Sequence, residues 1–165
     1  MEELHKACCF SGHRMEKLKC STEILEIALR EAINQAIADG FDTFYHGGCT
    51  GVDLIAAEQV LFRRFIVEQD DPMHIKLIAV LPFEEQAKYW NNHWRERYYN
   101  VLKKCDDAIT LHKRYKHGCY QERNRYMVDM CQRLIAVYND IPDRATKNTI
   151  LYAQKQGIEV KFIPL

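Results

Sequence analysis

Short apolar runs, each about the length of a β-strand, alternate along this 165-residue chain with amphipathic segments. The apolar runs lie at about 7–11, 42–46, 75–80, 107–111, 134–138 and 158–163. Strands that alternate with helices pair in parallel, because each helix carries the chain back to the edge where the next strand begins. The alternation predicts an α/β fold: a Rossmann-like three-layer sandwich with a mainly parallel six-stranded sheet and helices on both faces.

The segments between these runs have apolar residues at helical spacing. Ser21 can cap the first helix, whose apolar stripe includes Leu25, Leu29 and Ile33 and which Gly40 ends. Other helices are predicted near 52–68, 84–104, 119–131 and 144–156. No repeat or linker interrupts the alternation, and Asp70-Asp71-Pro72 is predicted to be a loop. We therefore expect one domain, 1–165.

Charge and composition restrict the function classes. The chain has 23 Lys and Arg residues and 23 Asp and Glu residues. Its net charge is therefore zero and lacks the positive excess that binds a nucleic-acid backbone. The aromatic and basic helix near 84–104 is better explained by packing on the sheet, and we do not expect nucleic acid as a partner. No apolar run is long enough to span a membrane, and Met1-Glu2-Glu3 does not start a signal peptide, which predicts a cytoplasmic protein. The seven cysteines lack metal-ligand spacing, so we expect reduced thiols and no metal.

A glycine-rich segment joins the second strand to the helix near 52–68. Gly47, Gly48 and Gly51 allow a sharp turn and close approach of a ligand to the backbone. Thr50 adds a hydroxyl, and the helix beginning near Val52 directs unpaired N–H groups at the turn. Such a corner suits a phosphate or a carboxylate, although a bare strand-to-helix connection has the same pattern. Asp53 could accept hydrogen bonds from a ribose or simply favour its helix N-terminus.

Polar and aromatic residues follow the other strands as well. In a parallel sheet the carboxyl ends of the strands meet at one edge, where ligands bind. The candidates there are Gly12, His13 and Arg14 after the first strand, Pro82, Phe83, Gln86 and Trp90 after the third, Arg123 and Asn124 after the fourth, and Thr146 and Thr149 after the fifth. We expect Gly12 and Gly48 to face one anion-binding cleft.

Several of these candidates have a structural alternative. Arg14 can form bidentate bonds to a phosphate or a surface ion pair. His13 could contact a phosphate or satisfy a backbone group. Gln86 and Trp90 are expected one turn apart on one helix face, where Trp90 either stacks on a base or packs in the core.

Four segments carry a family resemblance: FSGHR, GGCTGVDLIAAEQV, LPFEEQAKYW, and ERNRYMVDMCQRLIAVYND followed by TKNTILYA. They occur in this order and cover nearly the whole chain. The set resembles the YpsA-like branch of the SLOG superfamily, which also includes the LOG-type nucleotide phosphoribohydrolases and the Rossmann domain of DNA-processing protein A. The resemblance implies a Rossmann-like fold, a nucleotide or nucleotide-derived ligand and a bacterial cytoplasmic protein.

The chain departs from the hydrolase motifs in one respect. Tyr120–Asn124 resembles the MHERK motif of LOG-type enzymes, so Arg123 could take the place of its arginine. The PGGxGTxxE motif is degraded to Asp143-Arg144-Ala145-Thr146, and the helix that follows offers no carboxylate at Ile150, Leu151 or Tyr152. Without that glutamate, the usual acid–base partner for cleaving an N-glycosidic bond is missing.

The sequence therefore predicts a nucleotide-binding sensor or regulator that requires no cofactor. The alternative is a nucleotide N-glycosidic hydrolase, for which Arg123, Glu122 and Asp53 are the candidate catalytic residues. A nucleic-acid-associated module ranks third. The aromatic helix face could also serve a homo-oligomer.

Overall fold

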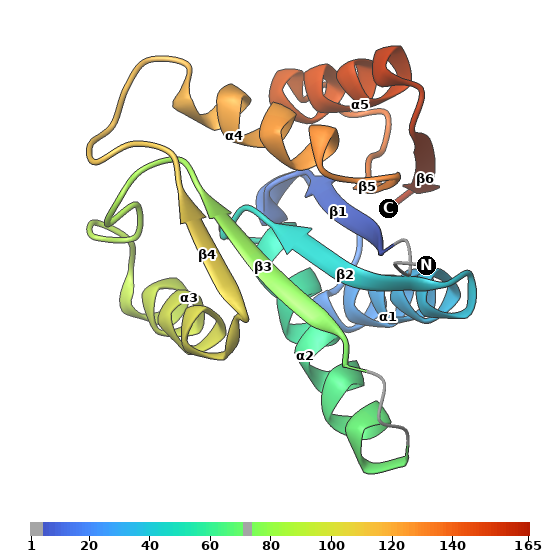
Figure 1. Ribbon diagram of the computed structural model, residues 1–165. Helices are drawn as coiled ribbons and strands as arrows, with labels where there is room; N and C mark the ends of the chain where they lie inside the picture. Colours follow the sequence, from blue (N-terminus) through green and yellow to red (C-terminus); the bar gives the residue numbers. More distant parts are fainter. Residues whose placement is uncertain (1–4, 71–73) are drawn as a thin grey trace.

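The computed structural model describes residues 5–70 and 74–165. Its strands are β1 (Lys6–Gly12), β2 (Phe41–His46), β3 (Lys76–Leu81), β4 (Asp107–Thr110), β5 (Arg133–Val137) and β6 (Glu159–Ile163). They form one sheet in the order β4-β3-β2-β1-β5-β6, and every neighbouring pair is parallel (Figure 1). The predicted Rossmann-like α/β fold is confirmed.

Helices cover both faces of the sheet. They are α1 (Thr22–Ala38), α2 (Val52–Asp70), α3 (Asn92–Lys104), α4 (Cys119–Asp129) and α5 (Arg144–Gln156), with a short 3₁₀ turn η1 (Met15–Lys17) after β1. The helices α1, α2 and α3 lie on one face, and α4 and α5 on the other (Figure 1). The chain adds β2, β3 and β4 on one side of β1 and then crosses to β5 on the other. This reversal makes the carboxyl ends of β1, β2 and β5 the expected place for a ligand.

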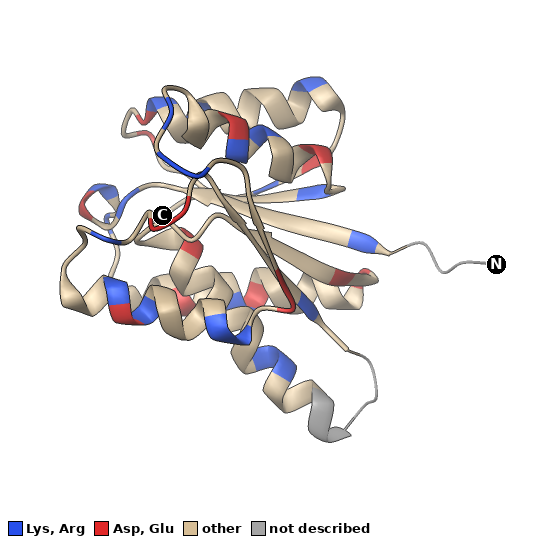
Figure 2. Ribbon diagram, turned by 60° about the vertical axis from the view of Figure 1, so that its left-hand side comes forward, with Lys and Arg blue, Asp and Glu red and all other residues tan. Residues whose placement is uncertain are grey.

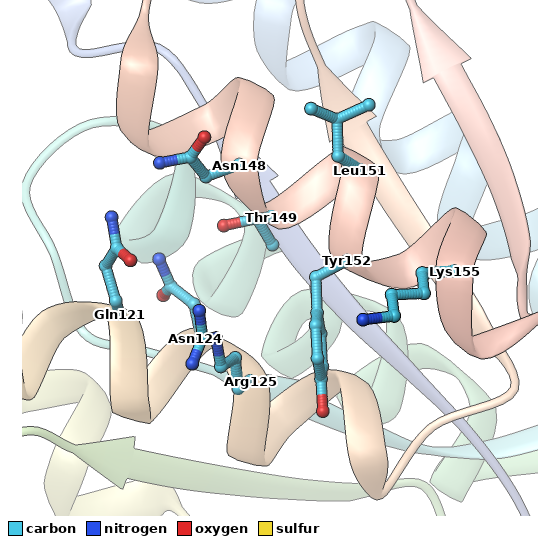
Figure 3. Close-up of a pocket in the computed structure, with 8 residues that line it drawn as sticks. All are labelled: Gln121, Asn124, Arg125, Asn148, Thr149, Leu151, Tyr152 and Lys155. Atoms are coloured by element: carbon cyan, nitrogen blue, oxygen red, sulfur yellow. The ribbon is translucent and has the colours of Figure 1, made fainter.

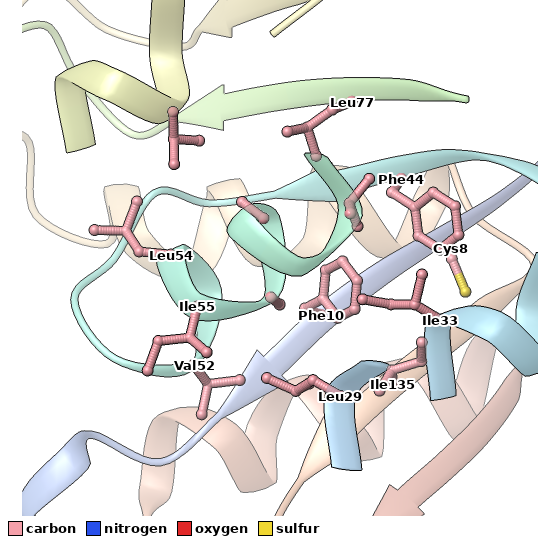
Figure 4. Packing of buried hydrophobic residues seen from close by; sticks show 14 of the residues in the cluster. Cys8, Phe10, Leu29, Ile33, Phe44, Val52, Leu54, Ile55, Leu77 and Ile135 are labelled. Carbon is pink, nitrogen blue, oxygen red and sulfur yellow. The ribbon is translucent and has the colours of Figure 1, made fainter. Parts of the chain in front are cut away.

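The central strands are buried on both faces, which explains their nearly continuous apolar sequences. Alternate residues point to opposite sides, so Cys8 and Phe10 of β1 join the core under α1–α3 while Cys9 joins the core under α4 and α5. Phe10 stacks on Phe44 with ring centroids 6.1 Å apart (Figure 4).

The helix boundaries follow from capping groups. The side chain of Ser21 accepts the N–H of Ile24, as the sequence predicts, and Asp143 accepts the N–H of Thr146 at the start of α5. Gly157, with φ at +77°, ends α5.

One predicted boundary is wrong. The helix expected from residue 84 begins only at Asn92, where the side chain of Asn91 accepts the N–H of Trp94. The residues before it form successive turns, and Glu85 has φ at +56°, which a right-handed helix does not allow. Gln86 and Trp90 therefore lie on a compact loop and do not share a helix face.

Two further expectations concern termini and loops. Met1-Glu2-Glu3 and two residues of the predicted loop, Asp71 and Pro72, lie outside the described residues, while Asp70 is the last residue of α2.

Among the described helices, none combines the length and apolar character needed to cross a bilayer. All seven cysteines are free thiols.

Candidate functional site

Residues 47–51 form a tight connection between β2 and α2, which we call the glycine corner. Gly48 and Gly51 have φ at +70° and +89°, in the region that side chains disfavour. Gly47 is required for space, because a Cβ there would lie 2.5 Å from Nη1 of Arg123. The corner is therefore built around an arginine that arrives from α4.

Arg123 is only 3% exposed and connects three groups. Its Nη1 donates to the Gly47 carbonyl at 2.6 Å, its Nη2 to the Cys49 sulfur at 3.2 Å, and its Nε to Oδ1 of Asn124 at 2.8 Å. Burial lowers the pKa of Arg123, but Cys49 and Asp53 outweigh burial and raise it, so the guanidinium remains charged. The arginine fixes the backbone of the corner from the α4 side.

Asp53 lies in the first turn of α2 and is 8% exposed. Burial raises its pKa above the ordinary value, although Arg123 and the backbone N–H groups of Cys49 and Gly47 act in the opposite direction. Its carboxyl group therefore accepts hydrogen bonds from the corner itself. This placement makes Asp53 part of the support of the corner.

Glu122 does not join Arg123. It lies on the exposed side of α4, where Oε2 is 2.7 Å from Nε2 of His112. The two neighbouring residues point apart because successive side chains on a helix are about 100° apart. The three candidate catalytic residues are thus not assembled around one point.

The turn after β1 packs directly against the glycine corner. A Cβ at Gly12 would lie 2.7 Å from the Val52 side chain, and one at Gly51 would lie 3.4 Å from the Met15 nitrogen. A Cβ at Gly48, in contrast, would meet Gln86 and Tyr98 at 2.9 Å and 3.0 Å. Both turns are therefore at the same edge of the sheet, and Gly12 and Gly48 make room for protein side chains.

His13 is buried and engaged within the protein. Its Nε2 accepts the N–H of Asn139 at 3.2 Å, its Nδ1 lies 3.3 Å from Oδ2 of Asp143, and its ring stacks on Tyr138. This arrangement corresponds to the structural alternative for His13. It connects the end of β1 to the segment that leads into α5.

Arg14 is placed differently. Its side chain is exposed and makes no hydrogen bond or ion pair with any residue in the described part of the chain. Burial raises the pKa of the Cys49 thiol, while the charges of Arg123 and Arg14 lower it in part. The backbone on either side of Arg14 lies against Gly51, since a Cβ there would be 3.7 Å from the His13 carbonyl oxygen and 3.4 Å from the Met15 nitrogen. Arg14 is therefore an exposed guanidinium next to the glycine corner and the start of α2.

The residues after β3 support the corner from the other side. Gln86 is buried and donates from Nε2 to the Gly47 carbonyl at 3.2 Å, while its Oε1 has no hydrogen-bond partner within residues 5–70 and 74–165. Trp90 packs edge-on against Tyr98 with centroids 5.4 Å apart and touches the core under α1–α3.

Phe83 follows the buried Pro82 and contacts two exposed tyrosines edge-on. The ring centroids are 5.8 Å from Tyr115 and 6.0 Å from Tyr120. Tyr120 lies in the first turn of α4, and its ring is 5.7 Å from the Arg123 guanidinium. An aromatic surface therefore continues from the glycine corner toward the loop after β4.

A polar pocket of about 340 Å³ lies between α4 and α5 (Figure 3). It includes Asn124 and Thr149, which the sequence predicts as ligand contacts, although Thr149 is 5% exposed and donates its hydroxyl to the Ala145 carbonyl. Thr146 is buried at the start of α5 and does not line the pocket. None of the described residues that line this pocket carries a carboxylate; the lining residues are Gln121, Asn124, Arg125, Asn148, Thr149, Leu151, Tyr152 and Lys155.

The sequence analysis missed Gln121, Arg125 and Lys155. Their helical spacing places them on one side of α4 or α5, but only the packing of the two helices brings them together. Asn124 belongs to both places: it lines the pocket and accepts from Nε of Arg123, which holds the corner. The pocket and the corner are therefore joined by one side-chain contact.

His46 is a further residue that the sequence analysis missed. It ends β2, is 1% exposed, and accepts the N–H of Gly48 at Nδ1, 3.1 Å away. Its Nε2 lies 3.4 Å from the sulfur of Cys105. Burial and, to a smaller extent, the charge of Arg123 lower its pKa from 6.5 to about 3. His46 is a neutral support of the glycine corner.

Comparison with known proteins shows the family of this chain. The family model described as the YspA SLOG family, YpsA, matches residues 8–163, which include every element of the corner and the pocket. The chain belongs to the YpsA SLOG family. It is 30% identical over 137 residues to a UPF0398 protein of Bacillus thuringiensis (strain Al Hakam), which covers 82% of this chain and 72% of the relative. A UPF0398 protein of Bacillus cereus (strain Q1) matches with the same identity and coverage.

Proposed function

We propose that this YpsA SLOG family protein binds a nucleotide or a nucleotide derivative at the carboxyl edge of its sheet and acts as a sensor or regulator. The observation that carries the proposal is Arg14. It is an exposed guanidinium without a partner in the described residues, and it lies beside the glycine corner at the N-terminus of α2.

The chemistry of this edge suits a phosphate. A helix N-terminus presents backbone N–H groups that have no partner inside the helix, and its dipole favours an anion. The fork of Arg14 can add two parallel hydrogen bonds to phosphate oxygens. The corner itself is held rigidly by Arg123, Gln86 and His46, so little ordering is required when the anion binds.

The pocket between α4 and α5 supports a ligand larger than phosphate. Its amides Gln121, Asn124 and Asn148 can donate and accept hydrogen bonds, which suits sugar hydroxyls or the edge of a base. Arg125 and Lys155 add positive charge that a second phosphate would match. Asn124 also accepts a hydrogen bond from the buried Arg123, which links the pocket to the backbone of the corner.

A panel of nucleoside phosphates, NAD and ADP-ribose should contain a compound that stabilises the protein against heat. At a concentration of 100 times its dissociation constant, such a ligand adds about 2.7 kcal/mol to the free energy of unfolding. The measurement is a thermal-shift titration followed by calorimetry. Arg14→Ala should remove most of the ligand-induced shift, because the variant cannot form the two hydrogen bonds to the phosphate. The Arg14 side chain is exposed, so its loss should leave the fold intact.

Lys76→Ala is the matched control for Arg14→Ala. Lys76 is an exposed cation at the amino end of β3, on the opposite edge of the sheet, and its loss should leave the ligand shift unchanged. If no compound of the panel shifts the unfolding temperature, or if both variants behave alike, the proposed site is wrong.

The placement of the acids favours binding over cleavage. Departure of a base from a nucleotide leaves a cationic sugar, which needs a nearby carboxylate and an activated water. Asp53 is occupied by the N–H groups of the corner, and Glu122 pairs with His112 on the exposed side of α4. We therefore expect purified protein incubated with purine and pyrimidine monophosphates to release no free base beyond the uncatalysed rate, as measured by chromatography.

The hydrolase alternative makes the opposite prediction. Many turnovers of free base per protein molecule, abolished by Asp53→Asn or Glu122→Gln, would establish catalysis and reject the sensor function. The exposed Asp129→Asn variant controls for a general effect of removing an acid from α4.

A further inference from the structure

The outer side of the α1–α3 layer exposes large apolar side chains. The two helices α1 and α2 pack side by side, and α2 also packs against α3, so α2 is the middle helix. Phe65 is 65% exposed, and Phe62 and Ile27 are each about half exposed. The exposed large apolar residues of α1 and α2, which we call the apolar ridge, are Ile24, Ile27, Phe62, Phe65 and Ile66.

A groove runs along the ridge between α2 and α3. Its volume is about 730 Å³, larger than the pocket between α4 and α5, and its floor includes Leu61 and Val101. The C-terminal half of α2 extends past the rest of the layer, so this part of the helix has neighbours on fewer sides (Figure 1). Phe62 and Phe65 both line this groove, and exposed apolar side chains that gather in this way mark interaction sites.

The two helices that flank α2 have net charges of opposite sign: α1 is acidic and α3 is basic. Helix α1 carries three acids, Glu23, Glu26 and Glu31, against one cation, Arg30. Glu23, Ile27 and Glu31 are four residues apart and share the exposed side of α1.

Helix α3 is basic. It carries four cations against the single acid Glu96; the cations are Arg95, Arg97, Lys103 and Lys104 (Figure 2). Arg97 pairs with Glu58 of α2, while Lys103 and Lys104 are exposed at the end of α3. The net charge of the face is therefore negative on α1, which also carries Ile24 and Ile27, and positive on α3. Between them α2 exposes Phe62, Phe65 and Ile66, and the Arg30 guanidinium lies over the Phe62 ring, 5.2 Å from its centroid.

We propose that two copies of this chain associate through this face about a two-fold axis. In a two-fold interface the same surface serves both partners, so a surface must be complementary to itself after rotation. If the axis runs along α2, rotation places the acidic α1 of one copy opposite the basic α3 of the other, twice, with the two α2 helices in the centre. An apolar centre with aromatic residues and a charged rim is the usual anatomy of such an interface.

The mass in solution tests the proposal directly. Sedimentation equilibrium at micromolar concentrations should give about twice the monomer mass of 19.5 kDa. Phe65→Asp should weaken the dimer at least about tenfold in dissociation constant, because it places a charge at the centre of the interface. Phe162→Asp, which changes an aromatic residue of β6 that is 49% exposed, should leave the dimer unchanged.

Charge reversal tests the two-fold pairing of α1 with α3. The variant Glu23→Lys/Glu31→Lys has two basic sides, and the variant Lys103→Glu/Lys104→Glu has two acidic sides, so each alone should dissociate. When the two variants are mixed, every α1 again meets an α3 of opposite charge, and a heterodimer should form. Circular dichroism checks that both variants are folded.

Three results would overturn the proposal. The first is a wild-type chain that remains a monomer at all concentrations. The second is a dimer that Phe65→Asp does not weaken, which would place the interface elsewhere. The third is a pair of folded charge-reversed variants that do not associate when mixed.

Discussion

Arg123→Met is expected to lower the free energy of unfolding by about 1.5–3 kcal/mol, the usual net contribution of hydrogen bonds made by a charged group. Methionine fills much of the same volume but cannot donate to the Gly47 carbonyl or to Cys49. It also leaves the buried carboxyl group of Asp53 without the nearby positive charge. Urea unfolding followed by circular dichroism measures the change.

Arg125→Met is the matched control for Arg123→Met. It makes the same change two residues along α4, at an exposed position, and surface substitutions usually alter stability by about 0.5 kcal/mol or less. If the two variants lose similar stability, Arg123 does not hold the corner. Arg123 also contacts Asn124, so Arg123→Met should weaken nucleotide binding as well. Loss of binding alone would not separate the two effects, and the free energy of unfolding without ligand is therefore the quantity to compare.

Acid is expected to destabilise the protein through His46. The unfolded chain binds a proton on this histidine below pH 6.5, whereas in the folded protein its pKa is lowered to about 3. Stability from this group is therefore complete above pH 6.5 and falls as the pH falls toward 3. Over the two and a half pH units down to pH 4, at 1.36 kcal/mol per unit, the loss is about 3 kcal/mol.

The slope of the free energy of unfolding against pH tests whether His46 is the cause. His46→Asn keeps an oxygen that can accept the N–H of Gly48 but cannot titrate, so its stability should fall less steeply between pH 6.5 and 4. His117→Asn, at an exposed loop position, should retain the slope of the wild type. Equal slopes for all three proteins would show that burial of His46 does not govern the acid response.

The periodic pattern of the sequence predicts much of the fold because it reflects local causes. Apolar runs of strand length give the six strands, and Ser21 and Gly157 give helix ends through capping and positive φ. The predicted boundary at residue 84 is wrong because its cause is not local. Glu85 adopts a left-handed conformation that its own sequence does not favour, and contacts of the neighbouring loop, such as the Glu84 N–H donated to the His112 carbonyl, stabilise the turn.

The candidate site likewise has parts that the sequence predicts and parts that only the folded chain brings together. The glycine corner, Arg14 and the start of α2 are visible in the sequence, because glycines and a helix N-terminus mark a turn wherever they occur. The role of Arg123 is different. Gly47 and Arg123 are 76 residues apart, and no periodicity relates them, yet the space beside Gly47 is filled by that guanidinium.

The sequence by itself determined the α/β class, the parallel strands and the edge at which polar residues gather, since each depends on spacing along the chain. The tertiary structure decided which of those residues face solvent and which support the backbone. His13, Asp53 and Arg123 are buried by segments that are distant in the sequence, while Arg14 is exposed. The pocket between α4 and α5 and the apolar ridge likewise exist only after packing, because each is formed by residues of two or more helices.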